Sequence, residues 1–202
     1  MLVCAAFVAM CAFYLAYQRL KRGSDLRLQI AVKCAATAMA AAVALLGCLK
    51  NGAAAHWVLL AGLAACAVAD GVLCVRFIPG GAIFALGHVL YMVAFCMMRR
   101  PGWMSAALFL ALIGAASAVL LRFRAGIGRA FPLILAYAAI LSLMVALASA
   151  QAPLYCVGAA LFAASDAMLG CLAMNRGNTR LDYISLGAYY LGQFLLGLAV
   201  LA

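Results

Sequence analysis

Hydrophobic residues run through this chain in eight long stretches, and polar residues gather in the short segments between them. Each stretch is close to the roughly 20 apolar residues that an α-helix needs to cross a bilayer. Glycine, proline and basic residues fill the intervening segments, which is typical of turns between antiparallel helices. The predicted helices are residues 2–18, 29–49, 56–75, 80–98, 103–121, 131–149, 153–174 and 183–202. We therefore expect an all-α, polytopic integral membrane protein with eight transmembrane helices in a single transmembrane domain, residues 1–202.

The composition excludes several other classes of protein. Of the 202 residues, 71% are hydrophobic and only 9% are charged, whereas about a quarter of the residues in a soluble domain are charged. So few charges cannot cover a water-facing surface, which excludes a soluble globular domain. The nine cysteines all lie inside apolar stretches, their number is odd, and no C-x-x-C occurs. They are therefore interpreted as small buried hydrophobes and not as disulfides or metal ligands.

The basic residues predict an orientation in the membrane. A net charge of +10 would suggest nucleic-acid binding in a soluble protein, but here the charges stand singly or in small groups between apolar stretches. That distribution suits anionic lipid head groups and topology, so we expect no nucleic-acid partner. Three basic residues mark one side: Lys50, Arg99 and Arg100. Ten mark the other: Arg19, Lys21, Arg22, Arg27, Arg76, Arg122, Arg124, Arg129, Arg176 and Arg180. We expect a multi-pass protein of a bacterial inner (cell) membrane, with the ten in the cytoplasm and both termini outside.

Three ionisable residues lie inside the predicted helices: Lys33, Asp70 and Asp166. Each would cost roughly 2.5–3.5 kcal/mol at the centre of a helix that faced lipid. They must therefore face one another or a wet cavity. A group of this kind indicates a functional site by default, and the alternative is a buried pair that locks helices together.

Further polar residues fall at a similar depth. Counted from the basic loops at 1.5 Å per residue, the two aspartates and the residues His88, Tyr137, Tyr189 and Tyr190 lie roughly 9–14 Å inside the membrane. Lys33 lies shallower, as a lysine that snorkels to the surface would. Six helices thus place polar groups in the cytoplasmic half, which predicts one site that opens toward the cytoplasm.

Helical spacing groups these residues further. Gln29, Lys33 and Thr37 form a polar stripe at i, i+4 and i+8. His88 shares a face with Tyr91, and Tyr190 shares a face with Gln193. Residues 67–73 and 163–169 also resemble each other as A-x-x-D-x-x-L, in predicted helices that run in the same direction. Two parallel four-helix repeats would explain this echo, although chance similarity in an alanine-rich chain would explain it too.

Residues from the second predicted helix onward, about 170 in all, resemble the YhhN family, which includes the animal transmembrane lysoplasmalogenases. Two departures from the family pattern affect helix packing: Ala69 stands where glycine is usual, and Cys34 stands where proline is common. The matching pieces, in order, are Lys33, Asp70, the segment Gly87 to Phe95, Ser165-Asp166, Asn175-Arg176, and the segment Tyr189 to Gln193.

The resemblance implies hydrolysis of the vinyl ether bond of lysoplasmalogens to a fatty aldehyde and glycerophosphoethanolamine or glycerophosphocholine. Two carboxyls in a low-dielectric layer suit this chemistry, because one can stay protonated as the acid while the other faces the oxocarbenium ion. We expect Asp70 and Asp166 to form this pair, and the sequence leaves open which is the acid. His88 is expected to relay protons or position water.

Other residues of the layer are expected to bind the substrate. We expect Tyr190 and Gln193 to bind the glycerol or head group and Lys33 to meet the phosphate, and we group Tyr91 and Tyr137 with the substrate-binding residues. No cofactor or metal is expected. The partners are the lysophospholipid substrate and membrane lipids, and the sequence carries no information on oligomeric state.

Two other functions remain open at the level of sequence. A small proton- or cation-coupled transporter or channel would use Asp70, Asp166 and His88 as a relay, although polar residues are nearly absent from the outer half. A structural membrane protein would use the same polar layer only to hold its helices together.

Overall fold

The computed structural model describes residues 1–21, 23, 25–174 and 179–202. Eight helices in this described part are long and apolar enough to cross a membrane, which confirms the all-α, polytopic prediction. The sequence-predicted residues Arg22, Asn175 and Arg176 lie outside the described residues. The elements are α1 (Leu2–Leu20), α2 (Leu26–Asn51), α3 (Ala54–Leu73), α4 (Phe77–Met98), α5 (Trp103–Arg122), α6 (Arg124–Ile127), the 3-10 helix η1 (Gly128–Ala130), α7 (Phe131–Ala148), α8 (Pro153–Met174) and α9 (Thr179–Leu201).

The helix ends follow local chemistry, with one correction to the prediction. The Asp25 side chain caps α2 by accepting from the Arg27 backbone N–H at 2.9 Å, and Gly52 ends it with a φ of 62°. The sequence predicts a break at residues 79–81, but α4 already begins at Phe77. Pro79 sits in the first turn, where proline removes no hydrogen bond that the helix would otherwise make.

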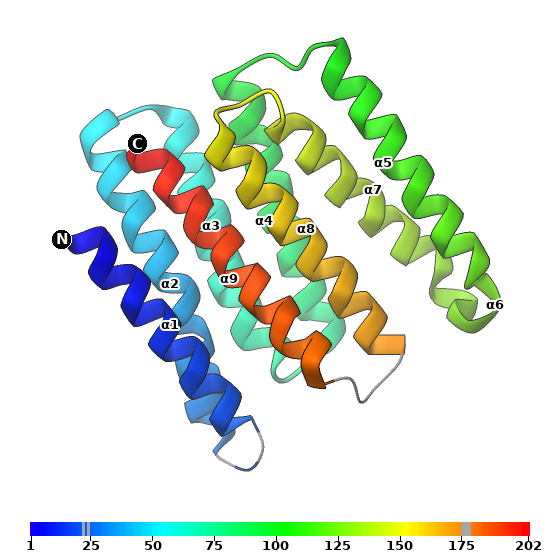
Figure 1. The fold of residues 1–202 in the computed structure, drawn as a ribbon, viewed down its shortest axis with the longest axis horizontal. Coiled ribbons are helices and arrows are strands. Elements are labelled where there is room, and N and C mark those ends of the chain that lie inside the picture. Colours follow the sequence, from blue (N-terminus) through cyan, green and yellow to red (C-terminus); the bar gives the residue numbers. More distant parts are fainter. Residues whose placement is uncertain (22, 24, 175–178) are drawn as a thin grey trace.

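The two halves of the chain repeat the same order of packing. In the first half α1 packs on α2, α2 on α3, and α3 on α4; in the second half α5 packs on α7, α7 on α8, and α8 on α9. The halves then meet through α2 against α9 and through α4 against α7 (Figure 1). This is the arrangement that a pair of parallel repeats would give. It places α3 and α8, which carry the two aspartates, in corresponding positions.

Small residues let the central helices approach closely. A Cβ added at Gly47 of α2 would lie 2.5 Å from the Val200 carbonyl oxygen of α9, and one at Gly197 would clash with the Ala40 carbonyl. Between α8 and α9, a Cβ at Gly192 would lie 2.8 Å from the Gly158 carbonyl oxygen. Backbone contact through small residues is the usual way for helices to associate in lipid, because burial of apolar side chains gains little there.

Both termini lie at one end of the bundle, and the C-terminal ends of α1, α3, α5 and α8 lie at the other, which we call the basic end (Figure 1). Lys21 and Asp182 pair there at 2.5 Å and tie α1 to α9. Successive long helices therefore run in alternate directions through the bundle, as predicted. Which end faces the cytoplasm stays a prediction from the distribution of basic residues.

Candidate functional site

Six helices bring polar side chains into the interior of the bundle. Among the described residues, Lys33, Asp70 and His88 are at most 6% exposed, and the Asp166 side chain is 7% exposed. His88 lies eleven residues after the start of α4, roughly 16 Å along the helix and deeper than predicted, because α4 begins at Phe77. Tyr91 and Gln193 lie deeper still. The polar groups therefore form a column that reaches past the middle of the bundle, and not a single shallow layer.

Asp70 forms a buried ion pair. Its Oδ1 lies 3.2 Å from Lys33 Nζ on α2, and its Oδ2 accepts hydrogen bonds from Thr37 at 2.5 Å and from Tyr189 at 2.8 Å. Lys33 does not snorkel to the surface, because its ammonium group turns inward to this carboxylate. The ring of Tyr17 on α1 also lies near Lys33, with its centre 5.8 Å from Nζ. A cation, two hydroxyl donors and an aromatic face together compensate the charges for leaving water.

Asp166 has a different set of neighbours. Its Oδ2 accepts a hydrogen bond from Tyr137 of α7 at 2.6 Å and lies 3.5 Å from Nε2 of His88 on α4. The other imidazole nitrogen, Nδ1, lies 2.5 Å from the Phe84 carbonyl oxygen. Since a carbonyl oxygen only accepts, this contact assigns a proton to Nδ1, so that in the neutral imidazole the free lone pair is on Nε2. Nε2 is buried and has no hydrogen-bond partner within the described residues.

The two aspartates occupy related environments. Each accepts from a side chain on the preceding helix of its own half, Thr37 for Asp70 and Tyr137 for Asp166. Each also faces the last helix of the other half, where Tyr189 meets Asp70 and His88 meets Asp166. The difference between them is Lys33, which supplies a cation to Asp70. The pseudo-symmetric frame thus holds one ion-paired carboxyl and one carboxyl beside an imidazole.

Ring contacts connect the neighbours of one carboxyl to the neighbours of the other. The Phe162 ring is 4.6 Å from the His88 ring and 5.2 Å from the Tyr189 ring, centre to centre. Phe84 also lies 5.7 Å from Tyr189. The two aspartates are therefore neighbouring sites in one interior, each with its own hydrogen-bond partners.

The remaining predicted residues lie nearby but bond to other groups. The Tyr91 hydroxyl donates to Gln193 Oε1 at 2.7 Å, and Gln193 Nε2 is buried without a partner in the described part of the protein. The Tyr190 hydroxyl is 3.5 Å from the Lys33 carbonyl oxygen. Tyr91 and His88 share a face of α4, as predicted, with ring centres 6.5 Å apart.

Sequence reasoning missed three members of the interior as site residues: Thr37, Tyr189 and Phe162. Thr37 belongs to the polar stripe that includes Lys33, and Tyr189 lies at the predicted depth of the site. The sequence therefore contains an indication for both residues. Phe162 carried none, since a phenylalanine in an apolar helix is unremarkable until its neighbours are known.

The chemistry of the interior is that of acids, bases and hydroxyl donors. Within the described residues, no three histidine, cysteine or acidic side chains gather as a metal site would require. What the side chains offer is a carboxyl and a neutral imidazole in contact, shielded from water, which is a set suited to proton transfer.

Comparison with known proteins gives one match. A model of the YhhN family matches residues 28–200, which is most of the chain and includes both aspartates and the side chains that pair with them or donate to them. Helix α1, which supplies Tyr17, precedes the matched range. No curated protein and no solved structure matches the chain.

Proposed function

Because the chain belongs to the YhhN family, we propose that it is a membrane-embedded ether hydrolase that cleaves the vinyl ether bond of lysoplasmalogens. The substrate class comes from the resemblance to the animal lysoplasmalogenases. The observation that supports the chemistry is the contact between Asp166 and the unpartnered Nε2 of His88, buried and 3.5 Å apart.

Hydrolysis of a vinyl ether begins with a proton transferred to carbon. In the proposed reaction Asp166 donates its proton to the β-carbon of the enol ether, and the positive charge spreads over the neighbouring carbon and the ether oxygen. A buried carboxyl without a cation beside it is less costly to keep neutral than to ionise. Asp70, which is paired with Lys33 at 3.2 Å, is poorly suited to donate this proton. We therefore propose Asp166, and not Asp70, as the acid.

Water then completes the reaction. A water molecule adds to the oxocarbenium carbon while His88 Nε2 accepts one of its protons. The hemiacetal collapses to a fatty aldehyde, and its hydroxyl proton passes to the glycerol oxygen. The imidazolium returns its proton to Asp166 across the 3.5 Å separation. One water molecule is consumed, and both side chains regain their starting states.

Asp70 takes the second role of the pair. Lys33, Thr37 and Tyr189 hold its carboxylate in a fixed position, and a preorganised negative group stabilises a cation that develops nearby. Tyr190 and Gln193 are proposed to bind the glycerol or head group, and Tyr91 orients Gln193 through its 2.7 Å hydrogen bond. The Lys33 ammonium group would bind the phosphate of the substrate only if the substrate displaced this group from Asp70.

The substrate is proposed to be a lysoplasmalogen of the inner leaflet of a bacterial inner membrane, with the site reached from the cytoplasmic side. The support for this orientation is the excess of basic residues in the loops at the basic end.

The test compares two lysolipids that differ only in the ether. Purified, folded protein should release aldehyde from a vinyl ether lysolipid and none from the saturated ether of the same chain and head group. The proposal would be refuted if no aldehyde were released from vinyl ether lysolipids with an ethanolamine head group and none from those with a choline head group. Proton or cation flux across proteoliposomes without turnover would instead favour the transporter.

A further inference from the structure

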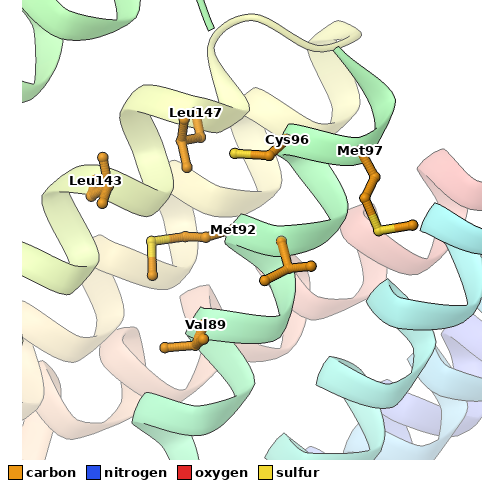
Figure 2. Close-up of a pocket in the computed structure, with 7 residues that line it drawn as sticks. Val89, Met92, Cys96, Met97, Leu143 and Leu147 are labelled. Atoms are coloured by element: carbon orange, nitrogen blue, oxygen red, sulfur yellow. The ribbon is translucent and has the colours of Figure 1, made fainter. Parts of the chain in front are cut away.

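A groove runs along the outside of the bundle between α4 and α7. It has a volume of about 430 Å³, and its lining is apolar apart from the thiol of Cys96. Figure 2 shows Met92 and Cys96 of α4 pointing across the groove toward Leu143 and Leu147 of α7. Val89 lies at one end of it and Met97 at the other, eight residues or roughly 12 Å apart along α4.

The groove lies on two of the helices that build the candidate site. Its two helices are the ones that carry His88 and Tyr137, the two neighbours of Asp166. Val89 directly follows His88, and Met92 lies one turn beyond His88 on the same side of α4. The end of the groove at Val89 and Met92 therefore lies within about one turn of His88 along α4, and the groove extends from there toward the end of the bundle that holds the termini.

The surroundings of the groove decide what can occupy it. Val89, Val93 and Met97 are 40–50% exposed, on a helix that is long and apolar enough to span a membrane. Hydrocarbon, not water or a soluble protein, is the medium at this surface. A polar ligand would find no hydrogen-bond partner along the lining.

We propose that this groove binds the alkenyl chain of the substrate lysolipid and so places its vinyl ether at Asp166 and His88. The inference rests on the proposed function. A single groove that leads away from the site suits a lipid with one chain, and the length of α4 beyond Val89 sets how long that chain can be. The chain would run past the middle of the bilayer while the head group stayed toward the basic end.

The first experiment measures turnover across a series of vinyl ether lysolipids with short, medium and long chains. Cys96→Trp fills the far end of the groove, and Leu110→Trp, on the lipid-exposed face of α5, is the matched control. For Cys96→Trp, kcat/KM with the long chain should fall about tenfold or more relative to the short chain. The control should keep the wild-type profile. An unchanged profile in Cys96→Trp would overturn the groove assignment while leaving the proposed activity intact.

The second experiment does not depend on turnover. A saturated ether lysolipid with a photoreactive group at the end of its chain should label α4 and α7 near Cys96 and Leu147. Unlabelled lysolipid of the same chain should displace it, and bulk diacyl phosphatidylcholine should not. Labelling spread evenly over the exposed faces of α1 and α5, or equal displacement by both lipids, would show only annular lipid and overturn the proposal. If the wild type releases no aldehyde, the proposed function fails, and this labelling alone decides the groove.

Discussion

The Nε2 atom of His88 lies 3.5 Å from Oδ2 of Asp166, and the two side chains come from helices in opposite halves of the chain. The Phe84 carbonyl, one turn earlier on α4, fixes the imidazole in the tautomer whose lone pair faces the carboxyl. The packing of the two halves thus brings the imidazole of one half into contact with the Asp166 carboxyl of the other.

Replacing His88 by phenylalanine should therefore remove the base while keeping an aromatic ring against Phe162. We expect kcat for aldehyde release to fall about 10²- to 10⁴-fold, the usual contribution of a general base, with little change in KM. His56→Phe, at the other histidine of the chain and in the first turns of α3, is the control and should keep wild-type activity. Comparable rates for the two variants would contradict the role of His88.

The Lys33–Asp70 pair should behave as one unit in stability. Lys33→Met leaves a buried carboxylate without its cation, and Asp70→Asn leaves a buried ammonium, so each should lower the free energy of unfolding by about 3–5 kcal/mol. The double variant should recover part of that loss. Unfolding in detergent, followed as a double-mutant cycle, measures the coupling. Strictly additive losses would mean that the two charges do not interact.

Tyr17 should stabilise Lys33 through its ring and not through its hydroxyl. Tyr17→Phe keeps an aromatic face 5.8 Å from Nζ, whereas Tyr17→Leu removes it. We expect the leucine variant to lose about 0.5–2 kcal/mol of stability relative to the phenylalanine variant. Thermal unfolding of both proteins gives the comparison. Equal stabilities would assign the contribution of Tyr17 to packing alone.

The contact between α2 and α9 should be sensitive to a single methyl group. Gly197→Ala would push its Cβ into the Ala40 carbonyl and separate the helices, at a cost of about 1–3 kcal/mol. Gly114→Ala on α5 is the matched control, since nothing lies within 4 Å of its added Cβ. The control should unfold at the wild-type temperature or slightly above it. A Gly197→Ala protein as stable as the control would contradict the close approach.

The sequence predicted the helices well because the bilayer imposes both their length and their composition. It located the interior polar residues for a related reason, since Lys33, Asp70 and Asp166 are too costly to face lipid. It could not predict which of them pair. That depends on the rotation of each helix about its axis, which packing sets. The depth of Lys33 along its helix predicts a lysine that snorkels to the surface, although its partner Asp70 also lies inside an apolar helix.

The depth of His88 shows a second limit. Pro79, Gly80 and Gly81 indicate a break between helices, and a depth counted from Gly80 places His88 about one turn too shallow, because α4 begins at Phe77. Proline in the first turn of a helix leaves no signal that separates it from proline in the preceding loop. The groove between α4 and α7 was also beyond sequence, because its walls are ordinary apolar residues whose significance comes only from the helix opposite.

Aldehyde release by Asp166→Asn, measured beside the wild type and Asp182→Asn, tests the account most directly. Asp182 pairs with Lys21 near the surface, with both side chains partly exposed, so its loss should cost little in stability and nothing in activity. For Asp166→Asn we predict a folded protein whose aldehyde release from a vinyl ether lysolipid falls at least about 10²-fold. A folded Asp166→Asn protein that releases aldehyde at the wild-type rate would contradict the central claim.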